Sequence, residues 1–277
     1  MDTEKQNDIT PSASPPEPPA ETNKSEESFD VGGKVFFLYP TNSIVNQIIN
    51  ELIQNEYEAY VAKDHSRLTY VLKKYPDCVI FINIDEKIAH SEWEKWINAV
   101  FSASQDIKIG VFSSNTDEEY REKFIKNNRI TCGFQTLKVD MTKSIDVILE
   151  MLRVMNVKGR RKYLRASMEH ESNVTINIPY GGNFLNGVIK DMSVVGFSCV
   201  FDQDPNLAKK TLLKDIQIKL QSMLLNVDAV VYGSRLHSTG EKTYVMIFTQ
   251  RVDSDVRVKI RKYIQKIIQQ KMDSEIN

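Results

Sequence analysis

Cysteine is scarce in this chain of 277 residues, and Cys78, Cys132 and Cys199 lie far apart, each in an apolar stretch. They form no CxxC pair and no group with histidine, which are the spacings that hold zinc or a redox disulfide. Widely spaced cysteines of this kind are typical of buried free thiols in a reducing compartment. We therefore expect neither a disulfide nor a metal site.

Long hydrophobic runs are absent too, since no apolar stretch approaches the roughly 20 residues that a helix needs to cross a bilayer. Met1–Lys5 lacks the basic and apolar regions of a signal peptide. Both observations predict a cytoplasmic protein with no transmembrane segment. The net charge of −1 provides no global field that attracts nucleic acid or anionic lipid. An anionic ligand would have to be bound by a local cluster of cations.

The sequence is also poor in catalytic groupings. It has four histidines, and no motif places one of them beside a nucleophile. No cluster of metal ligands and no glycine-rich phosphate loop is present. We therefore expect a binding protein and not an enzyme, with no catalytic residues and no cofactor.

Residues 1–31 differ in composition from the rest of the chain. They hold Pro11, Pro15, Pro16, Pro18 and Pro19 among Ser, Thr, Glu and Asn. Almost no side chain there could be buried, so nothing offsets the entropy cost of ordering the backbone. The composition predicts a disordered, proline-rich tail, with a partner-binding polyproline motif as the alternative.

From Lys34 onward, short apolar strands alternate with segments of helical periodicity. Two helices are expected to begin at capping boxes, one formed by Ser91 and Glu94 and the other by Thr116 and Glu119. Five strand–helix units in about 120 residues predict a parallel sheet covered on both faces. The expected strands lie at residues 35–38, 58–61, 79–84, 107–112 and 130–137.

This order of elements resembles the response-regulator receiver domain, and we assign residues 32–155 to a receiver-like, flavodoxin-like domain. The resemblance implies acidic magnesium ligands after the first strand, where this chain has Tyr39 and Pro40. It implies a phosphoacceptor at the end of the third strand, where Asn83 lies. Ser113 or Ser114, and Lys138, match the family's hydroxyl and lysine. We expect a degenerate receiver that is not phosphorylated on aspartate, with a surviving acceptor at Asp85 as the alternative.

After Lys158 the apolar residues recur at every second position, which is typical of half-buried strands. Six short antiparallel strands in about 80 residues predict a small barrel or a strongly curled sheet. The chain ends in a basic helix with an apolar stripe, which we expect to pack on that barrel and not on a membrane. The stripe consists of Ile260, Ile264, Ile267 and Ile268.

Two short motifs flank the first strands of the predicted barrel. Arg161 and Arg165 form an RxxxR motif, and Asp191, Ser193 and Gly196 form a DxSxxG motif that begins 26 residues after Arg165. Each motif alone is weak evidence, because paired arginines are common on solvated faces and DxSxxG suits an ordinary turn. Together, before and after the first barrel strands, they resemble the PilZ domain, a bacterial family of cyclic di-GMP receptors. We assign residues 156–277 to this domain, including an RxxxR linker and a C-terminal helix.

The resemblance implies a role for each motif residue, and the chemistry of each side chain agrees with it. The guanidinium groups of Arg161 and Arg165 can pair with phosphate oxygens or with guanine O6 and N7. The Asp191 carboxylate can accept from guanine N1–H and N2–H, and the Ser193 hydroxyl can add a hydrogen bond. Gly196 allows a sharp turn and a close backbone approach.

Arg160 lies directly before RxxxR. In the PilZ family this position influences whether one cyclic di-GMP molecule or a stacked pair is bound, and arginine resembles the pair-binding pattern. We expect ligand binding to change the arrangement of the two domains and to signal to a protein partner. Two alternatives stay open: a PilZ-like scaffold that binds no ligand, and a nucleic-acid-binding protein that uses residues 158–165 and the terminal helix.

Overall fold

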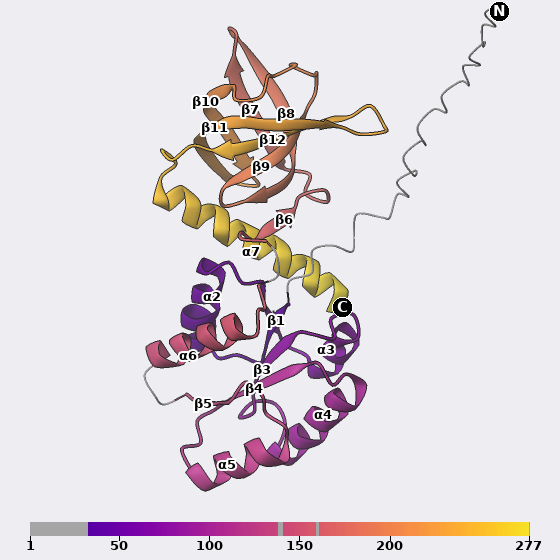
Figure 1. Ribbon diagram of the computed structural model, residues 1–277, viewed down its shortest axis with the longest axis vertical. Helices are drawn as coiled ribbons and strands as arrows, with labels where there is room; N and C mark the ends of the chain where they lie inside the picture. The colour runs from indigo at the N-terminus through magenta and orange to yellow at the C-terminus, as the bar shows by residue number, and fades with distance from the viewer. Residues whose placement is uncertain (1–32, 138–140, 159–160, 277) are drawn as a thin grey trace, which may run out of the picture. The chain divides into compact units, whose positions relative to one another are not determined.

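The computed structural model describes residues 33–137, 141–158 and 161–276, and the predicted tail of residues 1–31 lies outside these ranges (Figure 1). Two sheets account for the described strands. The first is parallel and belongs to the N-terminal half of the chain, and the second is antiparallel and belongs to the C-terminal half.

The first sheet has five strands in the order β2-β1-β3-β4-β5. Every pair in it is parallel. This is the strand order of the flavodoxin-like fold, in which ligands bind at the carboxyl ends of the strands. The predicted receiver-like fold is thus confirmed. The strands are β1 (Val35–Leu38), β2 (Ala59–Ala62), β3 (Val79–Asn83), β4 (Lys108–Ser113) and β5 (Phe134–Thr136).

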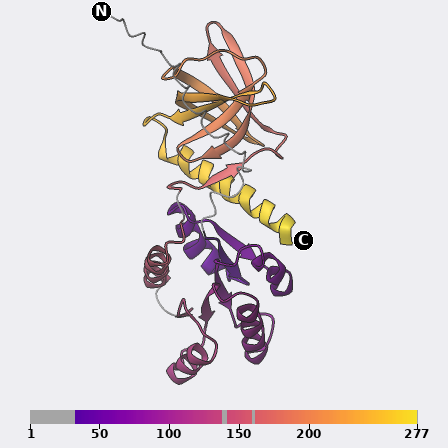
Figure 2. The same ribbon diagram turned by 45° about the vertical axis from the view of Figure 1, so that its right-hand side comes forward.

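Helices cover both faces of this sheet (Figures 1 and 2). One face packs against α3 (His65–Leu72), α4 (His90–Ala103) and α5 (Glu118–Asn127). The other face packs against α6 (Met141–Val154) and a continuous helical segment. That segment consists of α1 (Asn42–Ile44), a π-helical turn η2 (Val45–Ile49) and α2 (Asn50–Gln54). Because both faces are covered, the central strands are mostly apolar and buried, as expected for a parallel sheet.

Both predicted capping boxes are wrong. Helix α4 begins at His90, one residue before Ser91, and its N-cap makes no side-chain hydrogen bond. Helix α5 is capped by Asp117, whose carboxylate accepts from the backbone N–H groups of Glu119 and Tyr120. A carboxylate at the N-cap also interacts favourably with the helix dipole, which favours Asp117 over the neighbouring threonine.

The second sheet closes into the predicted six-stranded antiparallel barrel, since β8 pairs with both β7 and β9. A seventh short strand, β6 (Arg165–Ser167), adds to β8 outside the ring. The expected C-terminal helix is α7 (Ser254–Ile276), which buries its predicted isoleucine stripe. The barrel strands are β7 (Val174–Tyr180), β8 (Asn183–Ser193), β9 (Gly196–Phe201), β10 (Leu212–Leu220), β11 (Met223–Leu236) and β12 (Lys242–Phe248).

The three cysteines are buried free thiols, as predicted. Burial raises the pKa of Cys78 to about 12 and that of Cys132 to about 11, so neither thiol is activated as a nucleophile. Among the residues that the structure describes, no helix has the length and apolar composition needed to cross a membrane.

Candidate ligand-binding site

Strand pairing brings the two motifs together. Arg165 is the first residue of β6, and β6 pairs antiparallel with the end of β8. In this register Arg165 lies opposite Ser193, and Ser167 lies opposite Asp191. Arg165 therefore belongs to a strand on the barrel and not to the predicted linker, and residues 26 positions apart in sequence become neighbours.

A β-bulge turns Asp191 toward the barrel exterior. Between Ile189 and Asp191 the pairing of β8 with β9 shifts, so that Lys190 is an extra residue in β8. Without the shift, strict alternation would turn Asp191 inward together with the buried Ile189. With it, the Asp191 side chain is 31% exposed and faces Arg165 across the strand pair.

The Asp191 carboxylate already has two partners. Its Oδ1 lies 3.4 Å from Nη1 of Arg165, and its Oδ2 accepts a hydrogen bond from the Ser198 hydroxyl on β9. The Arg165 side chain is 47% exposed, so this ion pair contributes little to folding stability and can exchange for another partner. Ser198 was not predicted as a site residue. Its signal in the sequence is the alternation of β9, which places it beside Asp191 and on the face opposite to Phe197 and Cys199, where it is buried.

Arg161 lies within electrostatic reach of the same pair. Burial lowers the pKa of the Arg161 guanidinium from its ordinary value, the like charge of Arg165 lowers it further, and Asp191 opposes both. Both guanidinium groups therefore lie within electrostatic range of the Asp191 carboxylate. Guanidinium groups are suited to pairing with an anionic ligand.

Ser193 and Gly196 shape the turn that follows β8. The Ser193 side chain is buried, and its hydroxyl donates to the Gly196 carbonyl at 3.2 Å and accepts from the Val195 N–H at 3.4 Å. Gly196 does not adopt a positive φ. Glycine is required there because a β-carbon would lie 2.1 Å from the Met246 carbonyl oxygen of β12.

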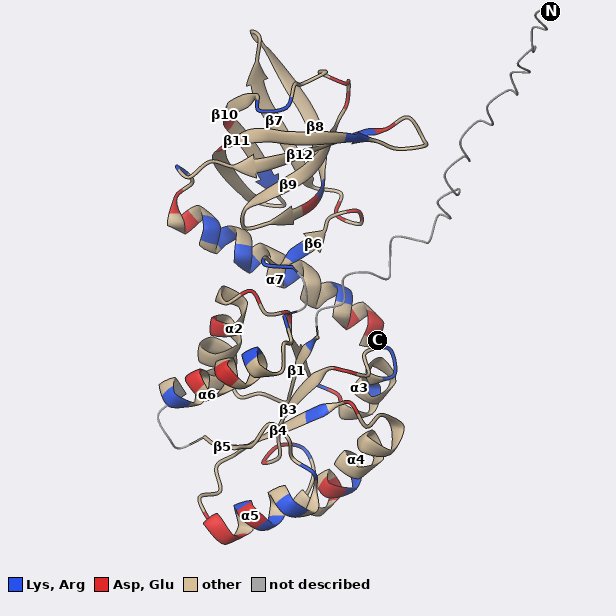
Figure 3. Cartoon of the chain, in the orientation of Figure 1, with Lys and Arg blue, Asp and Glu red and all other residues tan. Residues whose placement is uncertain are grey.

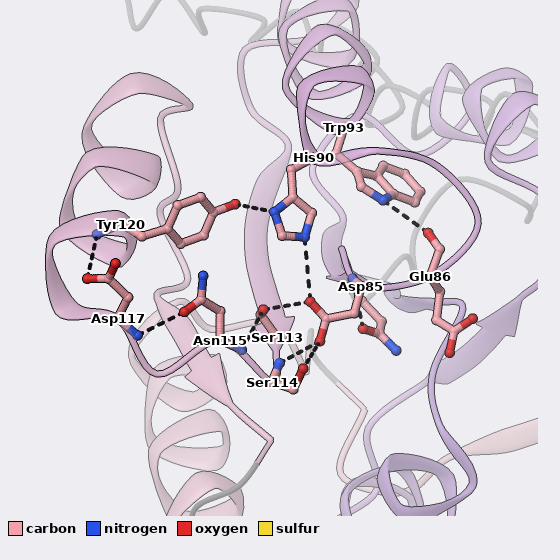
Figure 4. A network of polar contacts seen from close by, with 10 residues as sticks. Asp85, Glu86, His90, Trp93, Ser113, Ser114, Asn115, Asp117 and Tyr120 are labelled. Atoms are coloured by element: carbon pink, nitrogen blue, oxygen red, sulfur yellow. Dashed lines mark hydrogen bonds and ion pairs between the residues drawn. The ribbon is translucent and has the colours of Figure 1, made fainter.

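Asp85 anchors a second polar network, at the carboxyl edge of the parallel sheet (Figure 4). It follows β3 by two residues and points toward the end of β4. Its carboxylate accepts from the hydroxyls of Ser113 and Ser114, each at 2.7 Å, and from the Ser114 N–H at 2.5 Å. Nε2 of His90 lies 3.6 Å away, and Nδ1 of the same ring is 2.7 Å from the Tyr120 hydroxyl.

These hydrogen bonds keep Asp85 ionised. Burial alone would raise its pKa, but hydrogen bonds from Ser114 and Ser113 and the nearby His90 outweigh burial and lower it. Asn83, which ends β3, is buried and donates through its amide to the Tyr39 carbonyl at 3.1 Å. Within the described ranges, no three His, Cys, Asp or Glu side chains are grouped to hold a metal ion.

Several cations of the terminal helix are engaged within the protein. Figure 3 shows Lys and Arg along α7, with acidic residues near both of its ends. Nε of Arg261 lies 3.0 Å from Oε1 of Glu56, and Nζ of Lys266 donates to Oε1 of Gln221 at 2.7 Å. These contacts leave the helix less suited to phosphate backbone binding than its sequence indicated.

No protein-family model matches the sequence, and no curated protein matches it. Several solved structures do. One is the PilZ domain with c-di-GMP of YcgR from Escherichia coli, at 14% identity over 42% of this chain and 96% of that chain, with a TM-score of 0.36. Another is the MrkH–c-di-GMP complex of K. pneumonia, at 20% identity over 43% of this chain and 57% of that chain, with a TM-score of 0.38.

About two fifths of the chain is similar to PilZ domains. A response regulator from Thermotoga maritima is also similar, at 13% identity over 44% of this chain and 98% of that chain, with a TM-score of 0.38. The full YcgR structure in complex with c-di-GMP is matched over 49% of its own length. This chain therefore spans about half the length of the larger PilZ proteins that it matches.

The predicted site residues fall into three groups according to where the structure places them. Arg161, Arg165 and Asp191 come together on the barrel exterior. Ser193 and Gly196 are used in the turn beside them. Arg160 lies outside the described residues, as does Lys138 of the receiver-like region.

Proposed function

We propose that this protein is a cyclic di-GMP receptor that binds its ligand at the cluster of Arg161, Arg165 and Asp191. The observation that supports the proposal most directly is the juxtaposition of two guanidinium groups and one partly exposed carboxylate on the barrel surface. The phosphodiesters of the ligand require cations, and the guanine Watson–Crick edge requires an acceptor.

In this proposal the ligand replaces the ion pair that the site holds without it. The phosphates take over Arg165 and Arg161, and Asp191 accepts from a guanine while Ser198 continues to orient its carboxylate. Arg160 adds a cation for a second, stacked ligand. The protein acts by binding and not by catalysis, in the cytoplasm, and it signals to a protein partner through a changed arrangement of its two domains.

Isothermal titration calorimetry tests the proposal. Cyclic di-GMP is titrated into the wild-type protein, into an Arg161→Ala, Arg165→Ala double variant and into Arg153→Ala. Arg153 is a matched control, an exposed arginine paired with Glu150 on α6. Each lost charge-assisted contact should weaken binding about tenfold or more. We expect the double variant to lose binding and the control to bind like wild type.

The stoichiometry tests the role of Arg160, and the scattering profile tests the rearrangement of the two domains. Two ligands per chain would support the role of Arg160, and one would refute it. Small-angle scattering with and without ligand should differ if the domains rearrange, and superimposable profiles would refute the switch. If wild type does not bind and no substitution elsewhere in the chain restores binding, the ligand-free scaffold becomes the better description.

A further inference from the structure

Glu56 has a backbone conformation that its residue type does not favour. It follows α2, where its own N–H donates to the Ile53 carbonyl at 3.0 Å and the Tyr57 N–H donates to the Leu52 carbonyl at 2.9 Å. This is the Schellman pattern, and its left-handed position is usually occupied by glycine. Glu56 has a φ of 63°, which is strained for a residue with a β-carbon. The Glu56 side chain makes contacts that glycine could not make.

The Glu56 carboxylate connects three parts of the protein. It is only 8% exposed, and its Oε2 accepts from the backbone N–H of Leu164 at 2.9 Å. Its Oε1 accepts from Nε of Arg261 on α7 at 3.0 Å. Leu164 directly precedes Arg165, so Glu56 of the receiver-like domain holds the arginine segment of the proposed site and the terminal helix at once.

Helix α7 is held on the same domain by a second set of contacts. The Gln269 side chain donates to the Val61 carbonyl at 3.0 Å and accepts from the Val61 N–H at 2.9 Å, and Gln265 donates to the Ala59 carbonyl at 2.8 Å. These backbone groups belong to β2, the edge strand of the sheet. Four helical residues rise about 6 Å and two strand residues span about 6.6 Å, so the two spacings match. The helix thus satisfies groups that an adjacent strand would otherwise pair.

Glu56 binds donor groups for which the phosphates of the proposed ligand would compete. A backbone N–H and an arginine are typical phosphate donors, and here a carboxylate occupies them. A dianionic ligand drawn to Arg161 and Arg165 would also be brought toward the carboxylate of Glu56, which contacts Leu164, the residue next to Arg165. Like charges repel, and the ion pair with Arg261 offsets only part of the charge of Glu56. The Glu56 contact and the ligand should therefore disfavour each other.

We propose that Glu56 is an autoinhibitory positioning residue that holds the arginine segment in its ligand-free arrangement. The proposal rests on the cyclic di-GMP site proposed above. Ligand binding releases Leu164 from Glu56, and that release transmits the binding event to the receiver-like domain and to α7. By linkage, removing the Glu56 carboxylate strengthens ligand binding by as much as the ligand weakens the Glu56 contact.

The test compares Glu56→Gly, Glu56→Gln and Arg129→Gly with wild type. Glycine removes the carboxylate and suits the positive φ, so the helix end should still form. Arg129→Gly is the matched control, since it relieves a φ of 51° in the same domain without touching Glu56. Two measurements are made: calorimetric affinity for cyclic di-GMP, and hydrogen exchange at the Leu164 amide with and without ligand.

We expect Glu56→Gly to bind about tenfold more tightly than wild type, Glu56→Gln to be intermediate, and Arg129→Gly to be unchanged. The Leu164 amide should be protected in ligand-free wild type, and should exchange faster either on adding ligand or in Glu56→Gly. Binding that is detectable only in Glu56→Gly would support autoinhibition in a stronger form.

Two failures are distinguishable. If wild type binds and Glu56→Gly binds equally or more weakly, or if ligand leaves the Leu164 amide protected, the role of Glu56 is refuted and the receptor function stands. If neither wild type nor Glu56→Gly binds, the ligand assignment itself is refuted.

Discussion

Replacing Gly196 with alanine should destabilise the barrel without removing any ligand contact. A β-carbon at this position would lie 2.1 Å from the Met246 carbonyl oxygen and 3.1 Å from the Ile247 α-carbon. Both atoms belong to the backbone of β12, which pairs with β9 and cannot move aside like a flexible side chain. Overpacking of this kind costs about 1–3 kcal/mol, and a clash with backbone belongs at the upper end.

The same barrel offers a matched control. Gly233 of β11 has no atom within 4 Å of its hypothetical β-carbon and no positive φ. Gly233→Ala should therefore be neutral or stabilising by up to about 1 kcal/mol, because alanine lowers the conformational entropy of the unfolded chain. A loss of about 3 kcal/mol with a urea m-value near 2 kcal/mol/M lowers the unfolding midpoint by about 1.5 M.

Urea unfolding can follow the two domains separately. Trp93 and Trp96 both lie in α4, so tryptophan fluorescence reports on the receiver-like domain, while far-UV circular dichroism reports on the whole chain. We expect Gly196→Ala to lower the midpoint measured by circular dichroism more than that measured by fluorescence. Equal midpoints for Gly196→Ala and Gly233→Ala would refute the argument from close backbone approach. In that case, any weaker ligand binding by Gly196→Ala could not be attributed to destabilisation of the barrel.

Three further predictions concern the polar networks. Asp85→Asn should cost about 2 kcal/mol of unfolding free energy, because an amide NH₂ group would face the donors of Ser114. Since hydrogen bonds lower the folded-state pKa of Asp85, the ionised group stabilises the wild type above pH 3.8 and less so as the pH falls below that value. Chemical unfolding from pH 6 to pH 3 should show this loss in wild type, and a similar loss in Asp85→Asn would contradict it. Ser198→Ala should weaken cyclic di-GMP binding severalfold in calorimetry, because Ser198 orients Asp191. It should also lower the free energy of unfolding by about 1–3 kcal/mol, because it removes a buried hydrogen bond to a carboxylate. Unchanged affinity would exclude the orienting role.

The sequence alone determined the order of elements and their two periodicities. Continuous apolar runs such as Val35–Leu38 are buried on both sides, and alternating runs such as Leu212–Leu220 are buried on one. These patterns depend only on which face of a strand meets water, so they can be read residue by residue. The isoleucine stripe of α7 was predictable for the same reason.

Helix starts and the placement of the site were decided by the fold. Thr116 and Asp117 are both residue types that favour the N-cap position, and in the structure Asp117 caps α5. The register of β6 on β8 and the bulge at Lys190 bring Arg165 to Asp191, and both depend on pairing between segments distant in sequence. The double hydrogen bond of Glu56 to Leu164 and Arg261 joins residues more than 100 positions apart. No local pattern specifies such contacts, because their partners are chosen only when the domains pack.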